Sequence, residues 1–315
     1  MTQIVASSAP RRFALPSPWS VGALAIAALM VAPIAAVLWI ALFPSENIWP
    51  HLMSTTLPRY LKNTLILMLS VGALAAAVGT GAAWLIARYQ FFGARWLEWL
   101  LLLPLAIPAY VGAYALVDFL EYAGPVQTAL RDVFGWQSAR DYWFPEIRSR
   151  GAAVLVLSAS LFPYVYIMAR AAFREQSGCG EEVARSLGAG AIARFVRIGL
   201  PMARPAIAAG TAIVMMETVN DFGTVDYFAV QTLTTGIFSV WLQGGNLGGA
   251  AQIATVVLLM IVLLVTLEKF SRRQSKFFGT ARGQRPVSPA PLAGAGAWMA
   301  TVLCIIPVCA GFILP

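Results

Sequence analysis

Four polar residues with acid or amide side chains interrupt the apolar stretch 205–230: Glu217, Asn220, Asp221 and Asp226. Ionisable groups are costly in such a stretch, so they indicate a functional site by default. Glu217 and Asp221 are four residues apart, which puts them on one face of a helix. Carboxylate oxygens suit hard cations, so this face could line a path for transient passage of a metal ion. The alternative is structural: these groups bond to neighbouring helices, or the helix ends near Phe222 and leaves Asp226 at the outer surface.

A second candidate site is the charged stretch 181–201, which reads EEVARSLGAGAIARFVRIGLP. Glu182 and the glutamate before it open a helical pattern, where the helix dipole favours negative charge. Gly188 begins a break, and a second short helical pattern over 192–198 follows, which Pro201 is expected to stop. The stretch therefore predicts a helix, a tight bend and a helix on the membrane face. An amphipathic helix that only touches lipid headgroups is the alternative.

Groups that support enzyme chemistry or a metal centre are scarce in this sequence. The three cysteines lack a metal-binding spacing, and His51 is the single histidine. No catalytic residue, resident cofactor or stable metal site is therefore expected. The sequence has no phosphate-binding loop of the G-x-x-x-x-G-K-[ST] type, so any ATP must be bound by a partner. Nucleic acid is not expected as a partner, because no basic patch with interleaved aromatic residues is present.

The composition is that of a membrane protein built from several spanning helices. Of 315 residues, 59% are hydrophobic and 11% are charged, and the mean hydropathy is +0.73. A helix needs about 20 apolar residues to cross the hydrocarbon layer. Runs of this kind predict six spans, at 21–43, 63–87, 99–117, 151–169, 205–230 and 247–267. A further apolar helix is predicted in 291–315.

The distribution of basic residues predicts how the chain is oriented. With the tail 1–20 in the cytoplasm, most of the 22 lysines and arginines fall on the cytoplasmic side. The two richest segments on that side are the loop 171–204 and the linker 268–290. The net charge of +8 is thus explained by membrane topology.

Two features within the predicted spans concern helix shape and packing. The stretch LLLLPLAIPAY in the third span contains Pro104 and Pro108, which predict a kink. Gly72, Gly79 and Gly81 in the second span permit close contact with neighbouring helices. Their expected role is packing.

The loop 171–204 resembles the EAA loop of binding-protein-dependent ABC importer permeases. The family pattern is E-A-A, three residues, G, nine residues and I-x-L-P. The corresponding residues in this chain, with valine in place of the first alanine, are Glu182, Val183, Ala184, Gly188, Ile198, Leu200 and Pro201. The resemblance implies that this loop is a coupling helix that docks on an ATP-binding subunit. Small residues there would permit close approach, and the carboxylate of Glu182 could meet a basic group.

Further segments, among them LEWLLLLPLAIPAYVGAYAL, FPYVYIMARAAFREQ and METVNDFGTVDYF, make the chain similar to the ferric iron permeases of that superfamily. The resemblance implies a bacterial inner-membrane permease subunit, and not an enzyme, that couples ATP hydrolysis by a partner to substrate translocation. Relatives that carry thiamine, polyamines or sulfate share the architecture, so these three are alternative substrates. An ion-coupled secondary transporter is an alternative from another class.

The resemblance also implies partners and an architecture. The partners are ATP-binding subunits, two copies in number, an extracytoplasmic substrate-binding protein, membrane lipid and a second permease half or chain. The expected fold is a six-helix, type I-like permease half over 21–267 plus one further helix. Segment 291–315 weakly repeats the first span, with Pro307 aligned to Pro33. It is expected to be the first helix of a truncated second half, the alternative being a natural seven-helix chain.

Overall fold

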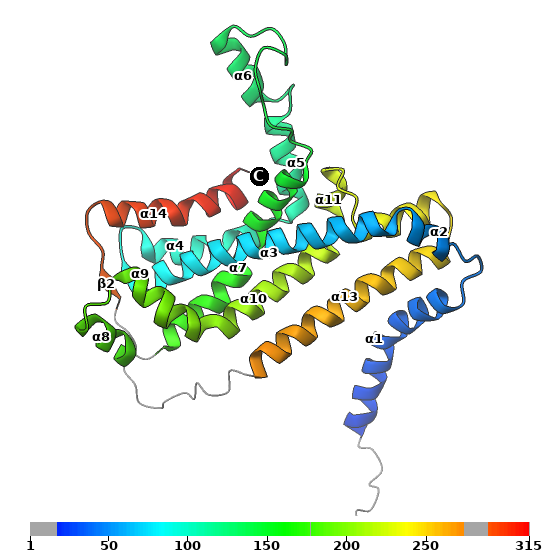
Figure 1. Ribbon diagram of the computed structural model, residues 1–315, viewed down its shortest axis with the longest axis horizontal. Coiled ribbons are helices and arrows are strands. Elements are labelled where there is room, and N and C mark those ends of the chain that lie inside the picture. The colour runs from blue at the N-terminus through cyan, green and yellow to red at the C-terminus, as the bar shows by residue number, and fades with distance from the viewer. Residues whose placement is uncertain (1–17, 177, 274–288, 315) are drawn as a thin grey trace, which may run out of the picture.

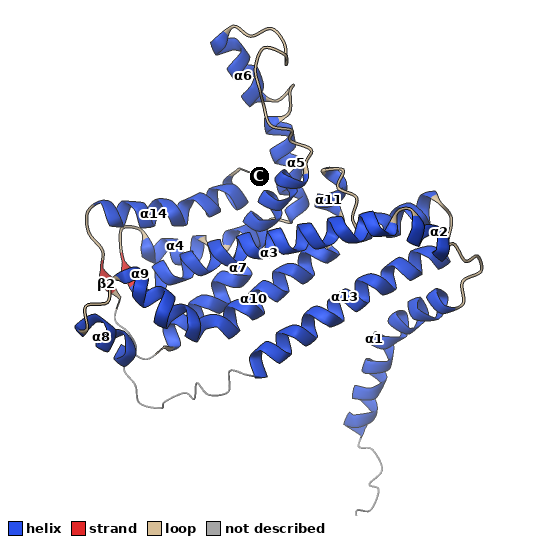
Figure 2. Cartoon of the chain, in the orientation of Figure 1, coloured by secondary structure: helices blue, strands red, loops and turns tan. Residues whose placement is uncertain are grey.

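The computed structural model describes residues 18–176, 178–273 and 289–314, in which helices joined by loops are accompanied by one pair of two-residue strands (Figure 2). Within the described residues, six helices are long and apolar enough to cross a membrane. The number is seven if a bent pair of helices counts as one span. The prediction of an all-α polytopic membrane protein is confirmed.

The elements follow one another along the chain as Figure 1 labels them. The long helices are α1 (Pro18–Leu42), α3 (Leu57–Arg88), α7 (Arg150–Glu175), α10 (Leu200–Asn220), α13 (Leu247–Arg273) and α14 (Ala295–Val308). The shorter helices are α2 (Trp49–Ser54), α4 (Ala94–Leu100), α5 (Ala109–Leu120), α6 (Pro125–Phe134), α8 (Gly178–Ser186), α9 (Ala191–Arg194), α11 (Gly223–Tyr227) and α12 (Leu233–Phe238). A 3-10 turn spans Leu103–Ala106, and π-helical turns span Phe195–Gly199, Ser239–Gln243 and Cys309–Ile313. The strands are β1 (Tyr89–Gln90) and β2 (Ala290–Pro291).

Helices α3, α7 and α10 pack side by side and form the centre of the bundle (Figure 1). A Cβ atom at Gly79 would lie 2.8 Å from the carbonyl oxygen of Phe162 and 2.9 Å from the amide nitrogen of Tyr166, both on α7. A Cβ at Gly72 would lie 2.7 Å from Met215 on α10. Both glycines therefore permit close helix packing, as predicted, whereas nothing lies within 4 Å of a Cβ at Gly81.

The third predicted span, 99–117, is not one kinked helix. The chain here forms two helical segments, Ala94–Ala106 and Ala109–Phe134, bent by 89°. Ile107 between them has an extended backbone, as the residue before Pro108 prefers, and proline has no N–H group to continue the helix. The predicted kink is therefore a complete break. Helix α5 packs against α7 and α11, and Figure 1 shows α6 projecting away from the packed helices.

The fifth predicted span, 205–230, has different limits in the structure. Helix α9, the π-helical turn and α10 form a continuous helix from Ala191 to Asn220, so the prediction that Pro201 stops a helix was wrong. The helix ends at Asn220 because Asp221 has an extended backbone, and the chain then forms α11. This end of the helix agrees with the structural alternative for the acidic stretch, in which the helix ends near Phe222.

The first and last helices differ in how the bundle covers them. None of the residues in α1 is buried, and this helix packs against α13. In contrast, α14 packs along α3 and α4, and Cys304 on it is fully buried. Strand β2, just before α14, pairs in parallel with β1, just after α3. The predicted tail 1–20 lies mostly, and the linker 268–290 partly, outside the described residues.

Candidate functional site

The EAA loop, residues 171–204, lies where α3 and α7 end and the helix leading into α10 begins (Figure 1). Helix α8 ends in a tight turn at Gly188, whose φ angle is +79°. The Gly188 amide donates to the carbonyl of Arg185 at 3.0 Å, and the Ala189 amide donates to that of Ala184 at 2.9 Å. These two bonds define a Schellman cap, which favours glycine at its left-handed position. The predicted bend is therefore present, with a helix on each side.

The structure divides the predicted docking residues into two groups. Glu182, Val183 and Gly188 are exposed on α8 and its turn, and Ala184 beside them is half-buried. The remaining residues of the motif, all half-buried around the π-helical turn and the start of α10, are Ile198, Leu200 and Pro201. The first group thus offers a surface, and the second connects that surface to the bundle.

Exposed apolar side chains continue the surface of α8. Leu187 is 81% exposed and Ile192, on α9, is 80% exposed. Val183 on α8 is also 52% exposed. With the carboxylate of Glu182 nearby in the sequence, this surface suits a partner that has an apolar groove and a basic group.

The π-helical turn, Phe195–Gly199, ends two residues before Pro201. Proline cannot donate a backbone hydrogen bond, so the regular helical ladder is interrupted there. The amide of Leu200 instead bonds to the carbonyl of Phe195, five residues earlier. Such turns are frequent at functional sites in helices. A Cβ atom at Gly199 would lie 2.3 Å from the Trp84 ring of α3, so this turn can approach α3 only because residue 199 is glycine.

A buried hydrogen-bond chain links this turn to the ends of α3 and α7. Arg88, the last residue of α3, donates from Nη2 to Oε1 of Gln176 at 2.7 Å. Gln176, the residue after α7, donates from Nε2 to the carbonyl oxygen of Gly199 at 3.0 Å. Arg88 is 4% exposed and Gln176 is 7% exposed. Three helices thus converge on one side chain, that of Gln176.

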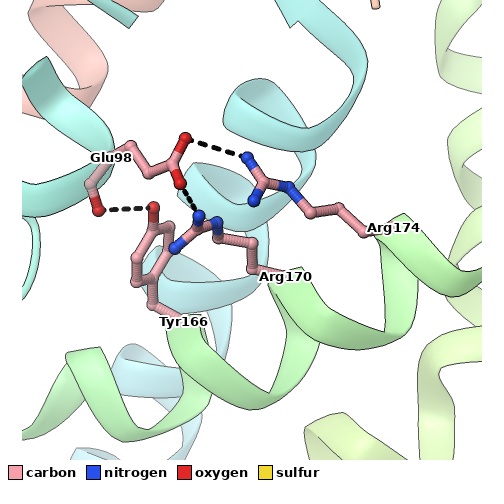
Figure 3. Close-up of polar contacts among 4 residues, drawn as sticks. All are labelled: Glu98, Tyr166, Arg170 and Arg174. Carbon is pink, nitrogen blue, oxygen red and sulfur yellow. Dashed lines mark hydrogen bonds and ion pairs between the residues drawn. The ribbon is translucent and has the colours of Figure 1, made fainter. Parts of the chain in front are cut away.

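A second polar cluster holds α4 against the last turns of α7, where the EAA loop begins (Figure 3). The Glu98 carboxylate pairs with Arg170 and accepts from Nη2 of Arg174 at 2.8 Å. Tyr166 donates its hydroxyl to the backbone carbonyl of Glu98 at 3.0 Å. Because two cations share one carboxylate, removing its charge leaves both without their anionic partner.

Glu98→Gln is therefore expected to destabilise the chain by about 1–3 kcal/mol, the usual cost of losing bonds to charged groups. The measurement is the thermal unfolding midpoint of the purified protein in detergent. Arg174→Gln is the matched control and should cost less, because its side chain is 48% exposed and water can replace the lost pair. An unchanged midpoint for Glu98→Gln would contradict a stabilising role for the cluster.

The four polar residues of the acidic stretch do not form one face. Glu217 and Asn220 are exposed in the last turn of α10. Asp221 is half-buried, and its carboxylate accepts from the hydroxyl of Thr224 at 3.0 Å and from the amide of Val225 at 3.1 Å. Asp221 thus organises the start of α11, and Asp226 is exposed on that helix. Asp221 caps α10, and its amide donates to the carbonyl of Glu217 at 2.9 Å, so these two residues stay adjacent at the helix end, whereas Asp226 lies beyond it on α11.

Sequence reasoning did not identify Arg88, Gln176 or Glu98 as functional residues. Arg88 directly follows the predicted span 63–87 and carries no motif in the sequence. A charged residue that is buried at a helix end must have a partner. The sequence alone does not show that such a residue is buried. The partners also lie far apart along the chain, 88 residues in the case of Arg88 and Gln176.

Residues 76–276 match a protein family described as the inner membrane component of binding-protein-dependent transport systems. The chain belongs to this family of multi-pass permeases, which are transport proteins and not enzymes. It is 30% identical over 224 residues to the molybdenum transport system permease protein ModB of Escherichia coli, covering 67% of this chain and 94% of that one.

Another relative is the Fe(3+)-transport system permease protein FbpB 2 of Haemophilus influenzae, which is 28% identical over 223 residues. The alignment covers 71% of this chain but only 39% of the length of that relative. Among solved structures, a chain of the bacterial alginate ABC transporter has the same fold, with a TM-score of 0.64 at 18% identity. That alignment covers 82% of this chain and 96% of the other.

Proposed function

We propose that this chain is the permease subunit of a bacterial ABC importer and that its substrate is ferric iron. A partner subunit binds and hydrolyses ATP, and the permease moves the substrate by alternating access. Closure of a pair of ATP-binding subunits displaces the EAA loops, and the attached helices rock to open the path on one side or the other. The N-terminus and the EAA loop lie in the cytoplasm in this proposal.

The observation that carries the proposal is the geometry of the EAA loop. An exposed helix, α8, ends in a glycine-dependent turn, and the same loop continues without interruption into the spanning helix α10. A force applied to α8 would therefore reach the bundle through a short and packed connection. Family membership further favours this ATP-driven mechanism over an ion-coupled secondary transporter.

The substrate is argued from charge and from the relatives. Glu217 is an exposed carboxylate in the last turn of a spanning helix, where an unneeded charge is costly. A carboxylate attracts a hard cation and repels an oxyanion, which favours ferric iron. Molybdate is the second candidate, because the molybdenum relative matches this chain over 94% of its own length. Sulfate, thiamine and polyamines are less favoured substrates.

The proposed partners have identifiable surfaces on the chain. The exposed face of α8 would dock an ATP-binding subunit, and a complete transporter would hold two copies. Helix α1 has no buried residue, so it offers an apolar surface to a second permease half or chain and to membrane lipid. An extracytoplasmic substrate-binding protein would deliver the substrate at the end opposite the EAA loop.

Glu217→Gln tests the substrate assignment. We expect uptake of radiolabelled ferric iron by cells with the complete transporter to fall about tenfold, equivalent to losing ~1.4 kcal/mol of attraction between carboxylate and cation. Uptake of labelled molybdate and sulfate is measured in the same cells. The matched control is Asp221→Asn, whose amide oxygen can still accept from the Val225 amide while its NH2 group donates to the Thr224 hydroxyl, so uptake should change little.

The outcomes separate the candidates. Ferric uptake that equals the parent value in Glu217→Gln would contradict a pathway role for this residue. Uptake of molybdate by the parent, without ferric uptake, would replace ferric iron by molybdate as the substrate. Uptake that continues when the ATP-binding subunit is inactivated would contradict an ABC importer altogether.

A further inference from the structure

We propose that Gln176 is a positioning residue for coupling: it fastens the π-helical turn of the EAA loop to α3 and α7, so that these helices move when the loop moves. The inference rests on the proposed function, because it concerns how movement of the docked loop reaches the spanning helices. It adds a role for two residues, Gln176 and Arg88, that lie outside the docking motif.

The position of Gln176 in the chain is the first argument. It follows Glu175, the last residue of α7, so it stands where the bundle ends and the EAA loop leaves it. Its amide makes two bonds in opposite directions, accepting from Arg88 at 2.7 Å and donating to the Gly199 carbonyl at 3.0 Å. The side chain thereby connects the residues on both sides of the loop, 23 positions apart.

The site of attachment on the loop is the second argument. Gly199 ends the π-helical turn that joins α9 to α10, and Pro201 two residues later removes a backbone donor. A helix with an interrupted hydrogen-bond ladder bends more easily than a regular one. The bond from Gln176 therefore acts at the point where α9 could otherwise bend without moving α10.

The burial of the chain of bonds is the third argument. Arg88, Gln176 and Gly199 are all buried, so water cannot readily replace a bond that breaks. The bond from Arg88 is assisted by its charge, which makes it stronger than a neutral one. The guanidinium carbon of Arg88 also lies 5.2 Å from the centre of the Trp84 ring, and the same ring packs against Phe195 of the turn. Polar and aromatic contacts thus hold α3 and the turn together.

Gln176→Glu removes one of the two hydrogen bonds of Gln176 and keeps the other. A carboxylate still accepts from Arg88, so the buried cation keeps its partner, but it has no hydrogen to donate to the Gly199 carbonyl. We expect substrate uptake per ATP hydrolysed to fall about two- to tenfold, the range that corresponds to one lost hydrogen bond. The complete transporter is assayed in membrane vesicles with ferric iron, and in parallel with molybdate. A change in this ratio reports coupling, which a loss of folded protein alone would not alter.

Gln127→Glu is the matched control. Gln127 is also buried, donates from Nε2 to a backbone carbonyl, that of Leu120, and accepts a bond from the hydroxyl of Tyr142. It lies on α6, away from the EAA loop, so its conversion to glutamate should leave uptake per ATP unchanged. Gln176→Leu removes both bonds and leaves Arg88 buried without this acceptor, so it should lower the amount of folded protein as well.

The results decide between the alternatives. A lowered ratio in Gln176→Glu with an unchanged ratio in Gln127→Glu supports the positioning role. If the parent transports and Gln176→Glu has the parent ratio, the positioning role is wrong and the proposed function stands. An equal fall in both variants would also overturn the role, since buried charge anywhere would then suffice. A parent that shows no ATP-dependent uptake of either substrate would overturn the proposed function together with this inference.

Discussion

Gly188→Glu is expected to reduce uptake to background while the chain still inserts into the membrane. Residue 188 has a φ angle of +79°, and a residue with a side chain in this left-handed conformation costs about 1–2 kcal/mol. No atom lies within 4 Å of an added Cβ, so the side chain would project outward onto the surface that carries Glu182. It would add bulk and a second negative charge where the ATP-binding subunit is proposed to dock. Uptake and co-purification of that subunit are the measurements.

Two further variants separate backbone strain from blocked docking. Gly188→Ala introduces the strain without the bulk or the charge, so it should retain part of the uptake. Gly190→Ala is the matched control, because residue 190 has an ordinary φ angle of −64° and open space around it. Normal uptake and normal co-purification in Gly188→Glu would remove the docking role from this turn.

Gly79→Ala is expected to reduce stability strongly. The added Cβ would lie within 3 Å of backbone atoms of Phe162 and Tyr166, and backbone cannot rotate away as a flexible side chain can. Helices α3 and α7 would have to separate along a fully buried region of the core. Overpacking of this kind costs about 1–3 kcal/mol. The thermal unfolding midpoint of the purified protein in detergent measures the loss.

Gly81→Ala is the control for this substitution. It lies two residues further along the same helix and makes the same chemical change, but an added Cβ meets nothing within 4 Å. Its unfolding midpoint should equal or slightly exceed that of the parent, because alanine favours the helix over glycine. Equal midpoints for the two variants would show that the contact between α3 and α7 does not require glycine at position 79.

The bend in the EAA loop and the main spanning helices could be predicted because both depend on local properties. A run of apolar residues must cross the membrane as a helix, since no other conformation satisfies the backbone of a single segment there. The predicted spans 63–87, 151–169 and 247–267 accordingly each lie within one helix. Gly188 could be identified as a break because glycine adopts a left-handed conformation without steric cost.

The third and fifth spans, whose predicted limits were wrong, show that the effect of a proline or an aspartate on a helix depends on its surroundings. Proline ends a helix in the third span at Pro108, yet Pro201 is accommodated within a continuous helix by a π-helical turn. The residue type is the same, and the difference lies in the surroundings, because the turn before Pro201 packs against Trp84 and is bonded by Gln176. In the acidic stretch, the bonds that the Asp221 carboxylate accepts from Thr224 and Val225 compete with continuation of α10.

Composition and short motifs were enough to predict the class of protein and the helix, bend and helix of residues 181–201. Each of these follows from composition or from residues close together along the chain. Which polar side chains meet could not be predicted, because hydrogen bonds such as the one from Arg88 to Gln176 join helices that are distant in sequence. The tertiary structure also decided that Glu217 stays exposed while Asp221 is engaged in a turn. The physical reason is that burial and partnership depend on how helices pack, and packing is a property of the whole bundle.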